Sequence, residues 1–153
     1  MNTIAKRINL FIRATLISAL VLISQPLLAE QFVAYGDYEV HYNAFNSTFI
    51  QPDVAQKLNI PRSKRRALIN VSVLKVEGDK KTPVRALVNG RTRNLMQQTQ
   101  EMTFRKVDEG TAIYYIGQFG FTDDQVMRIA LEVQPDPNQT PFKVEFEQKF
   151  YAE

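Results

Sequence analysis

Residues 142–150 read FKVEFEQKF, and this stretch decides the fold class of the chain. Apolar and charged side chains alternate along it, Phe142, Val144, Phe146 and Phe150 against Lys143, Glu145, Glu147 and Lys149. Successive side chains of a β-strand point to opposite faces, so the pattern predicts a strand with one face in a core and the other in water. An amphipathic helix would repeat its apolar residues about every 3.6 positions instead.

Further segments of the chain share this period of two. Residues 127–133 and 38–44 alternate in the same way. Two shorter strands are expected at 102–104 and 113–115, with a turn at 108–110 between them.

Two segments depart from simple alternation. Residues 67–76 are so densely apolar that we expect either a bulge or a strand covered on both faces. Asn89-Gly90 is the favoured pair for a two-residue type I′ turn, because both positions require positive φ. It predicts a hairpin between strands at 84–88 and 91–96.

One helix is expected at residues 51–60, QPDVAQKLNI. Pro52 suits the first helical position, and Asp53 favours the positive end of the helix dipole. Seven or eight short strands with turns between them, together with this one helix, predict an all-β protein. Its architecture is expected to be an antiparallel, immunoglobulin-like β-sandwich in a single domain, residues 30–153.

The first 29 residues have the pattern of a cleaved secretory signal. Lys6, Arg7 and Arg13 precede or border a short apolar run at 14–23, and no acidic residue occurs before position 30. Cleavage is expected after Ala29. The alternative is an uncleaved membrane anchor, but the uncharged run is about half of the roughly 20 residues that a spanning helix needs.

The composition excludes several classes of function. The signal carries three of the 19 basic residues and none of the 16 acidic ones, so residues 30–153 carry 16 of each. This balance argues against a general attraction to nucleic acid or to an anionic membrane. The chain has no Cys and a single His, His41, which excludes disulfides, thiolate sites and multi-histidine metal sites. We expect no cofactor and no metal.

Residues 35–49 are the most unusual stretch, YGDYEVHYNAFNSTF. Aromatic and amide side chains together suit contact with a protein partner. The residues expected to bind this partner are His41, Tyr42, Asn43, Phe45, Asn46, Ser47 and Thr48. The competing interpretation is structural: the aromatic rings enter the core, and the amides and hydroxyls hold the strand exit through hydrogen bonds to the main chain.

The same stretch, with QPDVAQKLNIPRSKRRALINVSVLK after it, resembles an uncharacterised domain-of-unknown-function family of small exported proteins of Gram-negative bacteria. The resemblance extends over nearly all of the chain after the signal. It implies a periplasmic protein with an immunoglobulin-like β-sandwich, and it brings no activity, substrate or catalytic residue.

A basic cluster follows Pro61. Arg62, Lys64, Arg65 and Arg66 could bind the phosphates of an envelope lipid or a small ligand. The competing interpretation is a solvated loop that keeps the next strand soluble.

Catalytic signals are weak. The paired acids Asp108-Glu109 and Asp123-Asp124 fall at expected turns, and no nucleophile, zinc or phosphate-loop motif occurs. We therefore expect a non-enzymatic binding or accessory module that contacts an envelope protein. A lipid or small-ligand binder is the alternative, and a hydrolase using these acids is a third possibility.

Overall fold

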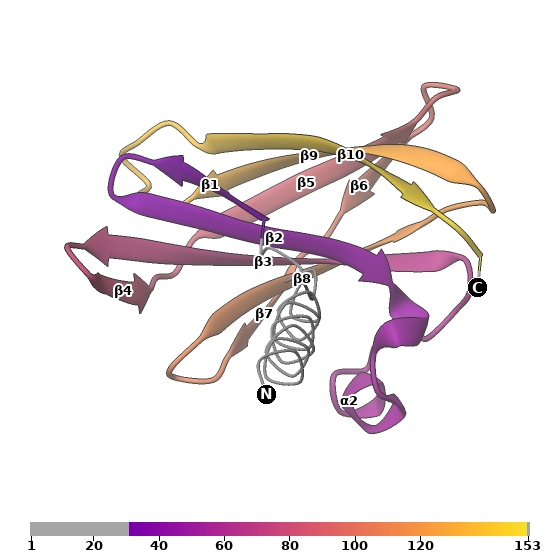
Figure 1. Ribbon diagram of the computed structural model, residues 1–153, viewed down its shortest axis with the longest axis horizontal. Helices are drawn as coiled ribbons and strands as arrows, with labels where there is room; N and C mark the ends of the chain where they lie inside the picture. The colour runs from indigo at the N-terminus through magenta and orange to yellow at the C-terminus, as the bar shows by residue number, and fades with distance from the viewer. Residues whose placement is uncertain (1–30, 153) are drawn as a thin grey trace, which may run out of the picture.

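The computed structural model describes residues 31–152, so the expected signal and its cleavage position lie outside the described residues. Within them the chain forms a sandwich of two antiparallel sheets (Figure 1). The strands are β1 Gln31–Tyr35, β2 Tyr38–Asn46, β3 Arg66–Glu77, β4 Lys80–Pro83, β5 Leu87–Asn94, β6 Thr99–Met102, β7 Arg105–Asp108, β8 Ile113–Gly120, β9 Gln125–Gln134 and β10 Phe142–Phe150. A 3₁₀ turn, η1 (Ser47–Phe49), and a short helix, α2 (Pro52–Lys57), connect β2 to β3.

The first sheet has the order β1-β2-β3-β8-β7, with β4 added beside β3, and the second has the order β10-β9-β5-β6. The predicted all-β antiparallel sandwich is confirmed, with ten described strands instead of seven or eight. Alternation is strict in β9, where Met127, Ile129, Leu131 and Val133 are buried. These inward side chains meet those of β2, β3, β8 and β10 in one core between the sheets.

A smaller core lies on the outer face of the first sheet. Leu68 of β3 is fully buried there against Ala55 of α2 and Ile60. The helix is shorter than predicted and covers only this end of the strand. Coverage on both faces therefore explains the dense apolar pattern at the start of β3.

The predicted Asn89-Gly90 hairpin is wrong. Both residues lie inside β5, where Gly90 pairs with Leu131 on one side and Met102 on the other. A Cβ on Gly90 would lie 2.9 Å from the Leu131 side chain. Glycine is needed here for close packing between the sheets, and this requirement overrides the local preference for a turn.

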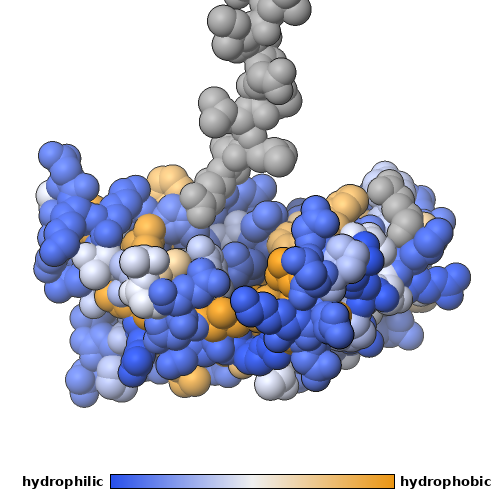
Figure 2. All heavy atoms as spheres, turned by 90° about the horizontal axis from the view of Figure 1, so that it is seen from below, coloured by the Kyte–Doolittle hydropathy of each residue, from blue (hydrophilic) through white to orange (hydrophobic). Residues whose placement is uncertain are grey.

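The strand predicted around 102–104 divides into β6 and β7, which belong to different sheets. Seen from below in the view of Figure 1, the surface is mostly hydrophilic, with a narrow, interrupted band of apolar residues along its middle (Figure 2). Within residues 31–152, no helix has the length and apolar character that a membrane span requires.

Candidate functional site

Aromatic rings close one side of the sandwich, where β1 and β2 pack against β10. Tyr35 stacks on Phe142 with ring centroids 4.5 Å apart, and Tyr38 contacts the same ring at 5.7 Å. The Tyr35 hydroxyl donates a hydrogen bond to a main-chain carbonyl of β10. Further along, Tyr42 packs on Phe146 at 4.7 Å.

Within residues 31–152, β1 pairs with only the first part of β2, and this side opens beyond Tyr42. The pairing of β1 with β2 ends at Gln31 opposite Tyr42, whereas β2 continues to Asn46. A groove of about 900 Å³ follows β2 and β10 from this point. Six aromatic side chains line it: Tyr42, Phe45, Phe49, Phe146, Phe150 and Tyr151.

Main-chain groups of β2 face the groove. The Ala44 carbonyl accepts a hydrogen bond from Nε2 of Gln148 in β10, at 2.9 Å. Both main-chain groups of a residue point to the same side of an antiparallel strand, so the N–H groups of Ala44 and Asn46 lie on this edge as well. Oδ1 of Asn70, which also lines the groove, is buried and has no hydrogen-bond partner within residues 31–152. The groove thus offers both donors and acceptors.

The structure brings together part of the predicted partner-binding set. The groove is lined by Tyr42, Asn43, Phe45 and Asn46. His41 lies on the opposite face of β2 from the core and is buried, Ser47 is fully buried, and Thr48 accepts a hydrogen bond from Arg62 through its main-chain carbonyl.

Asn46 and Ser47 hold the main chain, as the structural interpretation proposed. Nδ2 of Asn46 donates to the Tyr151 carbonyl at 2.7 Å and ties the end of β2 to the C-terminus. Oγ of Ser47 bonds both the N–H and the carbonyl of Ser63, at 2.9 and 3.0 Å. Asn43, by contrast, is exposed and remains open to a partner.

Replacing Asn46 by alanine is expected to lower the free energy of unfolding by about 1–2 kcal/mol, because the Tyr151 carbonyl loses its donor. Asn43→Ala should change it by less than about 0.5 kcal/mol, since that side chain is exposed. Urea denaturation of the two variants measures both values. Equal destabilisation would contradict this division of roles.

His41 belongs to a small charged network on the outer face of the first sheet. Its Nε2 lies 2.8 Å from Oε2 of Glu39, which also accepts a hydrogen bond from Lys81 at 2.9 Å. The Phe32 ring stacks on the imidazole at 5.0 Å. Within residues 31–152, no three His, Cys, Asp or Glu side chains gather in a group that could hold a metal ion.

Lys81 and then His41, through their hydrogen bonds, hold the pKa of Glu39 below its usual value of 4.5. A carboxylate with a lowered pKa stabilises the fold above its unfolded pKa, and this contribution is lost as the pH falls through the folded value. Glu39→Gln should therefore be less stable than the parent chain at neutral pH. The difference should shrink below about pH 4.5. Thermal melts between pH 7 and 3 test this, and a pH-independent difference would contradict it.

The predicted anion-binding set is divided by the structure. Arg62, Lys64 and Arg65 are exposed in the loop before β3. Arg66 lies in β3 itself, and its Nη1 donates to Oε1 of Gln118 at 3.4 Å. The loop residues thus form one surface, and Arg66 is separate from them.

The acidic pairs proposed for hydrolysis do not converge. Asp108 ends β7 beside the start of β8 and pairs with Arg85 at 3.4 Å. Asp123 follows the other end of β8, and Asp124 pairs with Lys149 at 2.6 Å. The length of β8 separates the two acidic sites.

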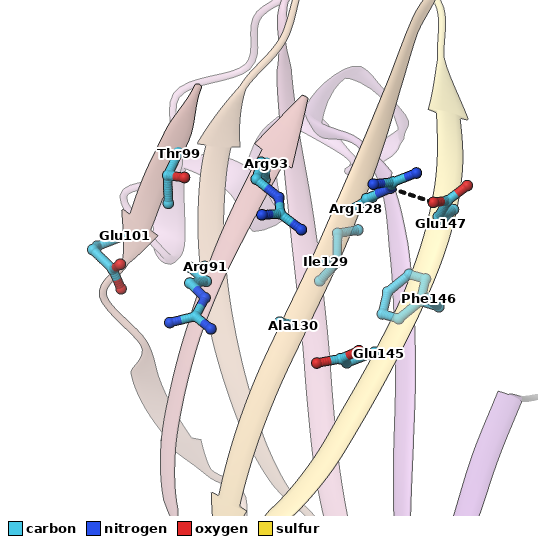
Figure 3. A pocket seen from close by; sticks show the side chains of 10 residues that line it. All are labelled: Arg91, Arg93, Thr99, Glu101, Arg128, Ile129, Ala130, Glu145, Phe146 and Glu147. Carbon is cyan, nitrogen blue, oxygen red and sulfur yellow. Dashed lines mark hydrogen bonds and ion pairs between the residues drawn. The ribbon is translucent and has the colours of Figure 1, made fainter. Parts of the chain in front are cut away.

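A second hollow, of about 560 Å³, lies on the outer face of the second sheet (Figure 3). The small side chain of Ala130 forms part of its floor, between Arg91 of β5 and Glu145 of β10. Arg128 and Glu147 form an ion pair at its rim. Because bases and acids alternate around it, this hollow favours neither an anion nor a cation.

Comparison with protein families assigns the chain. The family model described as "Domain of unknown function (DUF4426)" matches residues 32–153. The chain belongs to the DUF4426 family. A crystal structure of a DUF4426 family protein from Pseudomonas aeruginosa PAO1 is similar, with 32% identity and a TM-score of 0.69. The match covers 83% of this chain and 98% of the Pseudomonas chain. A search of the curated proteins gives no match.

Two more distant structures share the fold of this DUF4426 chain. FetP of uropathogenic Escherichia coli strain F11, recombinantly expressed in the periplasm of E. coli, is 16% identical with a TM-score of 0.58. That match covers 82% of this chain and 95% of FetP. A copper-bound variant of FetP is 15% identical with a TM-score of 0.57, over 82% of this chain and 97% of that one.

Several groove residues of this DUF4426 chain were not predicted from the sequence. Phe146 and Phe150 were expected only in the core, and neither Gln148 nor Tyr151 stood out. Nothing in the sequence signals directly that β10 lies beside β2, about a hundred residues away. One indirect signal exists: Gln148 interrupts the apolar face of β10, at the position where it bonds β2.

Proposed function

We propose that this DUF4426 chain is a non-enzymatic periplasmic binding module that holds an extended segment of a partner protein in the groove between β2 and β10. The main support for this function is the edge of β2 beyond Tyr42. There the main chain of Ala44 and Asn46 faces a groove lined with aromatic rings, and no residue of β1 within the described range pairs with it.

An added strand fits this edge by its hydrogen bonds. Extended peptides bind sheet edges through main-chain bonds, and alternate side chains enter pockets. The bond from Gln148 to the Ala44 carbonyl is the one that an incoming N–H would replace.

The register supports an open edge in the exported form. Since β1 runs antiparallel to β2, a longer β1 would continue from Gln31 along Asn43 to Asn46. With the proposed cleavage after Ala29, Glu30 alone would precede β1, and it would reach only the position opposite Asn43, short of Ala44 and Asn46. The periplasmic expression of FetP, which shares the fold, fits the same compartment.

Photo-crosslinking in cells tests this function. A photoreactive phenylalanine analogue replaces Phe45 or Tyr151 in the groove, and Leu87 serves as a matched exposed control at the far end of β5. We expect both groove positions to crosslink to one envelope protein, and to a single segment of it by mass spectrometry. Asn43→Ala should reduce the yield while the fold is retained. Absence of crosslinks, or equal crosslinks from position 87, would overturn the proposal.

A further inference from the structure

Exposed apolar side chains gather at one end of the sandwich. This helix end carries η1, α2, the tip of the β5–β6 hairpin and the C-terminus, at the right of Figure 1. Hydrogen bonds join its parts, from Asn46 to the Tyr151 carbonyl and from Gln100 to Gly120. Of the exposed large apolar residues within 31–152, all but Phe32 and Leu87 lie here: Phe49, Val54, Leu95, Met96 and Tyr151.

The hairpin tip presents its two apolar side chains on a turn closed by hydrogen bonds. Leu95 is 61% exposed and Met96 71%. Asn94, buried below them, clamps the turn: Nδ2 donates to Oε1 of Gln98 at 2.7 Å, and Oδ1 accepts from the Gln98 N–H at 2.9 Å. Turns usually carry small or polar residues, and adjacent exposed apolar residues on an ordered turn indicate a contact surface.

The bases at this end have no acidic partner within the described residues, and Arg62 donates one hydrogen bond to the Thr48 carbonyl. None of the ion pairs within residues 31–152 involves Arg62, Lys64 or Arg65. At the opposite end, by contrast, Lys75 pairs with Glu77 and Arg85 with Asp108.

The acids of the helix end offset this positive charge only in part. Asp124 pairs with Lys149, and Asp123 accepts the N–H of Ala152. Asp53 lies in the first turn of α2, which ends in the basic Lys57.

We propose that the helix end docks on the surface of a bilayer that contains anionic phospholipids. Val54, Leu95 and Met96 enter the interface, and Arg62, Lys64 and Arg65 contact the headgroup phosphates. The docking residues lie outside the lining of the partner groove, which reaches the same end through Phe49 and Tyr151, and the docking needs no membrane-spanning segment. The attraction comes from this local basic cluster, since residues 30–153 carry equal numbers of bases and acids. Two weak signals combine in it, as in other peripheral proteins: a small apolar insertion and a basic surface that anionic lipid attracts.

Vesicle sedimentation tests the charge component. The full gene is expressed, and the protein is purified in the form that the cells produce, with its N-terminus determined by mass spectrometry. Each base near an anionic surface strengthens binding about fivefold. Arg62→Gln/Lys64→Gln/Arg65→Gln should therefore weaken binding to phosphatidylglycerol-containing vesicles roughly 100-fold at low salt. The control Lys75→Gln/Lys80→Gln/Lys106→Gln has the same change in charge at the opposite end and should weaken it less than about threefold.

A tryptophan reporter locates the inserted surface, because the chain has no Trp of its own. Val54→Trp and Met96→Trp each place one fluorophore at the helix end, and Leu87→Trp places one at the opposite end. We expect the emission of the first two to shift to the blue with phosphatidylglycerol vesicles and that of the third to stay unchanged. No binding to these vesicles, equal effects of the two triple variants, or an equal shift from position 87 would overturn the proposal.

Discussion

Phe104→Ala is expected to lower the free energy of unfolding by about 3 kcal/mol. The Phe104 ring lies between two glycines that belong to different sheets, Gly90 of β5 and Gly117 of β8. A Cβ built on Gly117 would lie 2.8 Å from this ring, and one built on Gly90 would lie 3.1 Å from it. The ring therefore fills the space that both glycines leave, and alanine would leave a cavity there.

The Phe104 ring thus acts as a wedge between Gly90 and Gly117. A double-mutant cycle distinguishes the loss of this wedge from a general loss of buried apolar area. Gly117→Ala alone should cost about 1–3 kcal/mol, because its methyl group collides with the ring. The double variant Gly117→Ala/Phe104→Leu should lose about 1 kcal/mol less free energy of unfolding than the two single variants lose together. Urea denaturation gives all four values. A loss below about 1 kcal/mol for Phe104→Ala, or strict additivity, would contradict the wedge.

Phe150→Ala is expected to have a similar or larger effect, about 3–5 kcal/mol. Phe150 ends the last strand and is 2% exposed. Its ring meets Phe119 edge-on at 5.3 Å and Phe121 at 5.2 Å, so it joins the two sheets at the helix end. For a domain of this size the melting temperature should fall by roughly 10 °C or more.

The neighbouring position provides the control for this prediction. Tyr151 is 48% exposed. Its bond with Asn46 is made by its main-chain carbonyl, which an alanine at this position would keep. Tyr151→Ala should therefore cost less than about 1 kcal/mol while it removes a ring from the groove. If both variants melted alike, Phe150 would not be the residue that connects the groove to the core.

The strands that could be predicted from the sequence are those with one buried and one solvated face. β9 and β10 follow this rule residue by residue, so the period of two locates them. β2 follows it except at His41, which is buried on the outer face next to the buried Val40. β4 could not be predicted this way, because KKTP has no apolar residue to alternate. It pairs with the end of β3 through its main chain alone, which leaves no trace in a hydropathy pattern.

Asn89-Gly90 shows why local turn chemistry can fail. The pair favours a turn in isolation, yet Gly90 lies against Leu131, Met102 and Phe104 in the finished sandwich. These contacts come from residues that are distant in sequence, and their close packing requires a glycine in mid-strand.

The candidate site was half predictable for the same reason. The stretch 35–49 could be identified by its aromatic and amide content, and four of its predicted binding residues line the groove. The other wall comes from β10 and the C-terminus, and only the tertiary pairing of strands places it there. Burial then separates Asn43, which faces solvent, from Asn46 and Ser47, which hold the main chain.

Amide hydrogen exchange tests whether the edge of β2 binds an extended segment. The probe is a synthetic peptide with the sequence of the segment that crosslinks to position 45, added to the purified chain. We expect the N–H groups of Ala44 and Asn46 to exchange at least about tenfold more slowly with the peptide. The N–H of Thr82, in the short edge strand β4, should be unchanged. If the peptide bound and the exchange at Ala44 and Asn46 did not slow, the edge of β2 would not be the binding site.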